Sequence, residues 1–132
     1  MTFPTARATA GADSLFWMSG ATAIALYHHH PHVEEECILP DDIREQTLRV
    51  LTTFDEVLRF NGLEWKHVVK LAQFLTDLRD HDIVQETIAE HLARRGGGAP
   101  ATTVVGINAL SAPGARLELE LVAVRPAEEE LS

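Results

Sequence analysis

Two glutamates near the end of the chain are the side chains best suited by type and spacing to do chemistry. Glu118 and Glu120 alternate with leucines between residues 117 and 121, after a Pro-Gly turn. Such alternation is typical of a β-strand, whose successive side chains point to opposite faces, so both carboxylates share one face. A carboxylate in a partly dry cleft can serve as a general base, whereas one on an outer surface is only solvated. The environment of Glu118 therefore decides whether this face is catalytic.

A histidine-rich segment supplies the second group of candidates. Residues 28–40 contain four histidines, two prolines and three glutamates, a composition typical of a surface loop. Neutral imidazole can act as a general base near pH 7, so His30 is a candidate for substrate binding or proton transfer. A solvated loop is the alternative. We predict no metal site, because adjacent histidines rarely converge on one ion and the sequence has neither a His-x-x-x-His pair on an expected helix nor a spaced Cys pair.

Composition narrows the class of protein. The 132 residues predict a single domain over residues 1–132, and the 45% hydrophobic fraction suits a globular chain. The net charge of −9 disfavours binding to nucleic acid or anionic membranes. Cys37 has no partner for a disulfide, no secretory signal opens the chain, and no apolar run approaches the ~18 residues of a membrane span. We therefore expect a cytoplasmic protein.

Hydrophobic periodicity predicts the elements that position these residues. One helix is expected to begin at Asp41 or Asp42, whose side chain would cap it, and to run about 20 residues to Asn61-Gly62. A second helix is expected between Asp77 and Arg95. Strands are predicted over residues 14–20, with a further strand possible over 21–27, and over 67–76, 102–109 and from 116 onward. Residues 125–132 are expected to be a frayed acidic tail.

Each predicted helix has one apolar face, so both can pack on one face of a single mixed sheet, which is an α+β fold. The opposite face would carry Glu118 and Glu120. A bare sheet face next to Phe16 and Trp17 is unfavourable in water, so we expect other copies of the chain to cover it.

Six collinear segments resemble the Rid family, also called YjgF-like or RidA, of reactive-intermediate deaminases. They are LFWMSG (15–20), DIREQT (42–47), FDEVL (54–58), GLEWKHVVK (62–70), FLTDL (74–78) and LELELVAV (117–124). The resemblance implies a chorismate-mutase-like fold and a homotrimer with intersubunit clefts. It also implies hydrolysis of enamines or imines to carbonyl compounds and ammonia, with no cofactor.

The resemblance assigns roles residue by residue. Ser19 and Gly20 match the family's Ser-Gly at the cleft, and Gln85 falls where an asparagine is common. Glu118 matches the carboxylate that positions the attacking water. Thr102 stands where the family has the arginine that binds the substrate carboxylate. A hydroxyl cannot replace a bidentate cation, so a standard 2-imino acid is not the expected substrate.

These observations lead to three functional hypotheses. The first is a hydrolase for a small-molecule enamine or imine, with Glu118 activating water and Ser19, Gly20, Gln85, Thr102 and His30 binding the substrate. The second is a cofactor-free tautomerase or cyclase that uses the same carboxylate. The third is a non-catalytic trimer that binds a small ligand.

Overall fold

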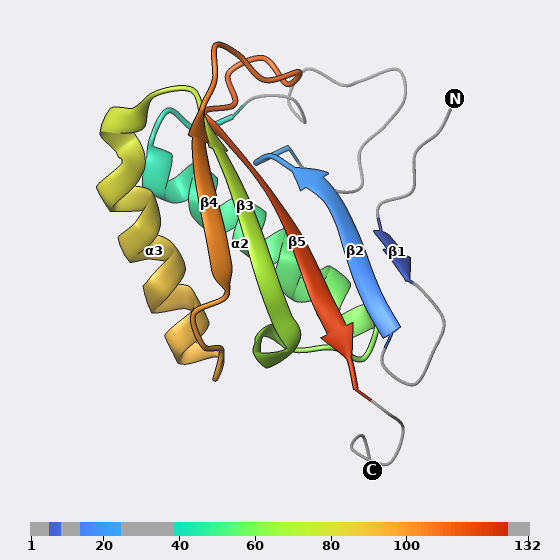
Figure 1. Cartoon of the computed structure of the whole chain (residues 1–132). Helices are drawn as coiled ribbons and strands as arrows, with labels where there is room; N and C mark the ends of the chain where they lie inside the picture. Colours follow the sequence, from blue (N-terminus) through green and yellow to red (C-terminus); the bar gives the residue numbers. More distant parts are fainter. Residues whose placement is uncertain (1–5, 9–13, 25–38, 127–132) are drawn as a thin grey trace.

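In the computed structural model, residues 6–8, 14–24 and 39–126 are described, and they form a five-stranded sheet with two helices on one face (Figure 1). The helices are α2 (Ile43–Phe60) and α3 (His81–Arg94). The strands are β1 (Ala6–Ala8), β2 (Ser14–Ala21), β3 (Val68–Leu75), β4 (Ala101–Gly106) and β5 (Leu117–Arg125). Two short 3-10 turns, η1 (Trp65–His67) and η2 (Leu78–Asp80), precede β3 and α3.

The sheet has the strand order β1-β2-β5-β3-β4. Strands β3 and β4 are parallel and joined through α3, whereas β5 pairs antiparallel with both β2 and β3. A parallel pair needs such a crossover, and the helix of the crossover covers one sheet face. In Figure 1, α2 passes behind the strands, so the opposite face is covered by neither of the two described helices. The predicted α+β fold, a mixed sheet with two helices on one face, is confirmed.

The leucines of β5 form the centre of the core. Leu117, Leu119 and Leu121 are almost completely buried, as are Leu51 and Phe54 on α2. Burying one such side chain stabilises a fold by about 1.5–3 kcal/mol. This burial determines which face of the sheet each side chain of β5 occupies. Because the odd-numbered residues lie in the core, the even-numbered residues must lie on the other face. Glu118 and Glu120 therefore lie on the face without helices, which we call the open face.

Helix α2 ends as the sequence predicts but begins differently. Gly62 has a φ of +73° just after the helix, and the backbone N–H of Leu63 donates to the carbonyl of Leu58 at 2.8 Å. A left-handed glycine of this kind is a common helix stop. At the other end Asp42 is the N-cap residue, but its side chain makes no capping hydrogen bond. The expected aspartate cap is therefore wrong.

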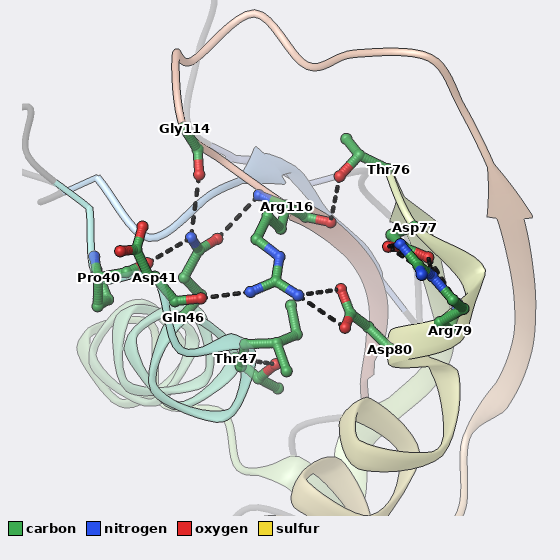
Figure 2. A network of polar contacts seen from close by, with 11 residues as sticks. Pro40, Asp41, Gln46, Thr47, Thr76, Asp77, Arg79, Asp80, Gly114 and Arg116 are labelled. Carbon is green, nitrogen blue, oxygen red and sulfur yellow. Dashed lines mark hydrogen bonds and ion pairs between the residues drawn. The ribbon is translucent and has the colours of Figure 1, made fainter.

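A buried amide holds the turn that precedes β5 (Figure 2). The side chain of Gln46 donates to the carbonyls of Pro40 at 2.7 Å and Gly114 at 3.0 Å, and its oxygen accepts from the backbone N–H of Arg116 at 2.9 Å. The guanidinium of Arg116 donates to both carboxylate oxygens of Asp80 and to the carbonyl of Asp41. Together these bonds hold Arg116, the residue just before β5 begins, two residues before Glu118.

Three strand predictions differ from the structure. Strand β1 was not anticipated, β2 ends at Ala21 without a further strand over residues 22–24, and β4 ends at Gly106 instead of continuing to residue 109. Gly106 pairs with Leu75, the last residue of β3, so β4 has no strand partner beyond that point. The histidine-rich segment, including His30, lies outside the described residues, as does most of the acidic tail.

A helix that crosses a bilayer needs about 20 mainly apolar residues. Within residues 6–8, 14–24 and 39–126, neither α2 nor α3 is long and apolar enough to cross a membrane.

Candidate active site

Glu118 lies in the middle of the open face. It is paired with Phe74 of β3, whose partner on the other side is Val105 of β4, so these three side chains form one row across the sheet. Trp17 of β2 lies on the same face and is 48% exposed. Glu118 itself is half-buried. A carboxylate set among large apolar side chains is only partly hydrated, which is the environment that a general base requires.

Gly20 packs directly against the carboxyl group of Glu118. A methyl group at Gly20 would lie only 2.7 Å from Oε2 of Glu118 and 2.8 Å from its Cδ. The contact arises at a β-bulge, because Ser19 and Gly20 of β2 oppose the single residue Glu120 of β5. Bulges redirect strands and side chains, and they are common beside active sites. The bulge therefore brings Gly20 against Glu118 on the open face, and Ser19 is the exposed residue that precedes Gly20 in β2.

The pKa of Glu118 is raised above the ordinary value for a glutamate. Burial is the larger cause, since desolvation disfavours the charged form, and the negative charge of Glu120 is the smaller one. Both causes move the carboxyl group toward the pH range in which it can take up and release a proton during turnover. A raised pKa at a partly buried carboxylate is a recognised mark of functional sites, although ion-pair networks also perturb pKa values.

Thr102 and Gln85 lie on the other side of the sheet. Thr102 pairs with the core residue Leu71 and donates to its carbonyl at 2.6 Å. The amide nitrogen of the buried Gln73 donates to Oγ1 of Thr102 at 2.8 Å and to Oε1 of Gln85 at 3.2 Å. Gln85, on α3, returns a hydrogen bond to Oε1 of Gln73 at 2.6 Å. Thr102 and Gln85 therefore share a polar group with Gln73, separate from Glu118.

This polar group forms one wall of a cleft of about 400 Å³ between α3 and the strands. We call it the α3–β4 cleft. Its other walls are apolar side chains of α3 and β3 and the segment that leads into β4. The described residues that line it are Leu71, Gln73, Gln85, Ile88, Ala89, Leu92, Ala93, Gly97, Gly98, Ala99, Pro100 and Thr102. Its volume lies within the range of small-molecule sites.

Sequence reasoning missed Gln73. The signal was present, because Gln73 lies two residues from both Leu71 and Leu75 in a strand and must share their buried face. A glutamine that is 1% exposed needs hydrogen-bond partners, and these partners are the two residues predicted from the motifs.

The sheet itself separates the two groups of residues. Glu118 with Ser19 and Gly20 is on the open face, and Gln85 with Thr102 is on the helix-covered face. Among the described residues, the cleft lined by Gln85 and Thr102 is not lined by Glu118, Ser19 or Gly20. His30 lies in the segment that the structure does not describe.

A sequence comparison identifies the family. Residues 6–125 match the family described as endoribonuclease L-PSP, which is nearly the whole chain. This chain belongs to that family, also known as the YjgF or Rid family. The resemblance first recognised in the six segments is thereby confirmed.

Curated relatives of this Rid protein match it over part of their length. It is 35% identical over 83 residues to protein DfrA of Myxococcus xanthus, a match that covers 63% of this chain and 60% of DfrA. It is 28% identical over 88 residues to the 2-iminobutanoate/2-iminopropanoate deaminase of Rattus norvegicus, covering 67% and 61% of the two chains. The matched region thus spans about three fifths of these relatives.

Solved structures of the Rid family share the fold. E. coli TdcF with bound serine superposes with a TM-score of 0.77 over 95% of this chain and 89% of TdcF, at 20% sequence identity. At this identity the similarity establishes the fold and not the activity.

A second hollow, of about 530 Å³, lies beside an ion-pair cluster centred on Asp55 of α2. The Asp55 carboxylate accepts from Nε1 of Trp65 at 2.5 Å, from Nε2 of the buried His91 at 3.0 Å and from Nε of Arg95 at 3.0 Å. Burial alone would raise the pKa of Asp55, but the hydrogen bonds and charges of these partners together lower it. The cluster joins α2, η1 and the end of α3, so its evident role in this Rid protein is structural.

A protein metal centre needs several ligating side chains that converge on one ion. Across the described ranges of this Rid protein, no three His, Cys, Asp or Glu side chains are arranged to hold a metal ion.

Proposed function

We propose that this protein is an imine or enamine hydrolase in which Glu118 activates the attacking water. The observation that carries the proposal is the half-buried carboxyl group of Glu118, packed on Gly20 in the open face with a raised pKa. Family membership supports it, because curated relatives of this chain are named 2-iminobutanoate/2-iminopropanoate deaminases.

The chemistry requires few groups. An enamine first takes a proton on carbon to become the imine. The imine is protonated by solvent to the iminium ion. The Glu118 carboxylate then accepts a proton from water as the water oxygen bonds to the iminium carbon, and the π electrons pass to nitrogen to give a carbinolamine. Glu118 returns its proton to that nitrogen as the C–N bond breaks, so that ammonia leaves, and the hydroxyl proton passes to solvent as the carbonyl forms. Both proton transfers suit a carboxyl group whose pKa is raised toward neutrality, and the sequence of steps needs no cofactor.

The separation of the two residue groups supports a homotrimer with shared sites. Glu118, Ser19 and Gly20 face one way and the α3–β4 cleft lies on the other side of the sheet, so a site that uses both must be built from two copies of the chain. The exposed Trp17 and Val105 give the open face an apolar surface that another copy would cover. In this proposal one protomer supplies the carboxylate and another supplies the cleft, where Gln85 and Thr102 bind substrate. His30 is proposed to contact the substrate as well.

The direct test is turnover by Glu118→Gln. Substrates are imines generated in solution by an amine or amino-acid oxidase, and ammonia and the carbonyl product are measured. Glu118→Gln should lower kcat by about a hundredfold or more, the usual contribution of a general base. Glu120→Gln is the matched control, since it removes a carboxylate from the same strand face and should retain most of the turnover. Unchanged turnover in Glu118→Gln would refute the mechanism.

Isotopic water separates this proposal from the alternatives. Hydrolysis places ¹⁸O from labelled water in the carbonyl product as it forms, provided that the product is reduced immediately to prevent exchange. A tautomerase or cyclase would give a product without solvent oxygen, and a ligand-binding protein would give no product at all. Either of those results would overturn the hydrolase.

A further inference from the structure

The lining of the α3–β4 cleft contains information about the substrate that family membership does not supply. Every described residue that lines the cleft is uncharged. Leu71, Ile88 and Leu92 are buried apolar side chains, and Gln73, Gln85 and Thr102 are neutral hydrogen-bonding groups. A carboxylate moved from water into such surroundings would lose its hydration without gaining a cation. The described walls therefore disfavour an anionic group.

The polar wall of the cleft is also largely occupied with its own hydrogen bonds. Gln73 uses its amide nitrogen for both Gln85 and Thr102, and the hydroxyl of Thr102 is directed to the carbonyl of Leu71. The amide nitrogen of Gln85 donates one hydrogen bond, to Gln73 at 2.6 Å. An amide nitrogen carries two hydrogens, so among the described contacts one N–H of Gln85 remains for a ligand. Gln85 is half-buried, which leaves it accessible from the cleft.

These observations define the chemistry of the group that fits. We infer that the α3–β4 cleft binds an uncharged, mainly apolar part of the substrate, with one hydrogen-bond acceptor facing Gln85. Combined with the proposed function, on which this inference rests, the substrate class is a neutral imine with an aliphatic or small ring substituent. Gln73, Gln85 and Thr102 together determine specificity, because they present fixed neutral dipoles at a position where a cation would select a carboxylate.

Two imines that differ only by a carboxylate provide the sharpest comparison. Leucine with an amino-acid oxidase yields 2-imino-4-methylpentanoate, and 3-methylbutylamine with an amine oxidase yields the corresponding neutral imine. The wild-type protein should hydrolyse the neutral imine with a kcat/KM about tenfold or more above that for the imino acid. The carboxylate of the imino acid must be desolvated and finds no charge-assisted contact in the cleft. Equal or faster hydrolysis of the imino acid would overturn the inference while leaving the hydrolase intact.

A cation placed in the cleft should reverse this preference. Gln85→Arg, on the half-buried surface of α3, should raise kcat/KM for the imino acid relative to the neutral imine by about tenfold to a hundredfold. Thr102→Arg introduces the charge from the strand and is a second variant in case one of them folds poorly. Gln85→Met has a similar length without charge and is the matched control, which should leave the imino acid disfavoured. If both arginine variants fold and neither reverses the preference, the inference is contradicted.

Binding of stable analogues tests the cleft independently of turnover. The neutral 3-methylbutanamide should shift the side-chain amide NMR signals of Gln85 at lower concentration than 4-methyl-2-oxopentanoate does. Binding of the amide without any imine turnover would support the cleft assignment and overturn the proposed hydrolase. Preferential binding of the oxo acid, or binding of neither compound, would overturn the cleft assignment.

Discussion

Gly20 and Glu118 are in direct contact across the pair β2 and β5, where the glycine lacks the side chain that would occupy the position of the carboxyl group. A Cβ at residue 20 would come within 2.7 Å of Oε2 and 3.1 Å of Cγ of Glu118. The β-bulge at Ser19–Gly20 creates this approach. The glycine is therefore required by packing against the candidate base and not by a left-handed backbone, since its φ is outside the range that favours glycine.

Gly20→Ala is expected to displace the Glu118 carboxyl group. The added methyl group forces the carboxyl away from its position, and misplacing a catalytic group by about 1 Å can cost about a hundredfold in rate. We expect kcat to fall at least tenfold, with a stability loss of only about 1 kcal/mol, because the clash is with the end of a flexible side chain that can rotate. Steady-state kinetics and urea unfolding measure the two effects.

A double-mutant cycle isolates the cause. If the clash is with the Glu118 side chain, then Gly20→Ala should cost far less stability in a Glu118→Ala background, because the side chain that it meets is gone. An equal cost in both backgrounds would show that the contact is not with Glu118.

The pH dependence of turnover should respond to Glu120. Glu118 must be ionised to accept a proton, so activity falls as the pH drops through its raised pKa. Glu120→Gln removes the smaller of the two causes, so the acid limb of the pH–rate profile should move to lower pH. The pKa should remain above the ordinary glutamate value, since burial persists. Titration of the Glu118 carboxyl carbon by ¹³C NMR measures the same pKa directly, and a value unchanged or raised in Glu120→Gln would contradict the assignment.

Asp55 should contribute stability that is lost in acid. Its folded-state pKa is lowered, so the contribution is present above the unfolded-state pKa and disappears as the pH falls through the folded-state value. Asp55→Asn should reduce the free energy of unfolding by about 1–3 kcal/mol at pH 7, because His91 and Arg95 lose their charged partner. The difference from the wild type should shrink below about pH 4.

Urea unfolding across pH measures this effect. Asp82→Asn, at the fully exposed Asp82 of α3, is the control and should change little. A constant difference between Asp55→Asn and the wild type at every pH would refute the ionic contribution.

Gln46→Glu should destabilise the start of β5. The substitution keeps an acceptor for the backbone N–H of Arg116 but replaces the amide donor with a carboxylate facing the carbonyls of Pro40 and Gly114. Burying these unpaired groups at a position that is 1% exposed should cost about 2 kcal/mol or more.

The free energy of unfolding in urea provides the measurement for Gln46→Glu. Glu45→Gln alters the exposed neighbouring residue on α2 and should have little effect. Equal stability of the wild type and Gln46→Glu would contradict the role of the amide.

The sequence was most informative where burial alternates strictly. Leu117, Leu119 and Leu121 are buried because an apolar face must pack against the helices, and this determines the face on which Glu118 lies. Pattern and family motifs together predicted Ser19, Gly20 and Glu118 as site residues, and the structure places Gly20 against the carboxyl group of Glu118. Strand β1, with only Ala6–Ala8, is too short to have a periodic signal.

Other features depended on contacts that no single segment encodes. Strand β4 is exposed along most of its length, so its burial pattern does not reveal which face Thr102 occupies, and only pairing with Leu71 decides it. The approach of Gly20 to Glu118 depends on the register shift between β2 and β5, which is set by strand pairing. The alternation of β3 indicates that Gln73 is buried, but its hydrogen bonds to Gln85 and Thr102 depend on how α3 packs.

We propose that Glu118 of one protomer acts on substrate held in the α3–β4 cleft of another, and mixing two inactive variants tests this arrangement. Glu118→Gln lacks the carboxylate, and Ala89→Trp fills the cleft from an exposed position of α3. Each variant alone should be inactive. After unfolding and refolding as an equal mixture, about a quarter of the sites should combine an intact carboxylate with an intact cleft, and so restore about a quarter of wild-type turnover. Turnover no greater than that of the separate variants would contradict a site shared between protomers.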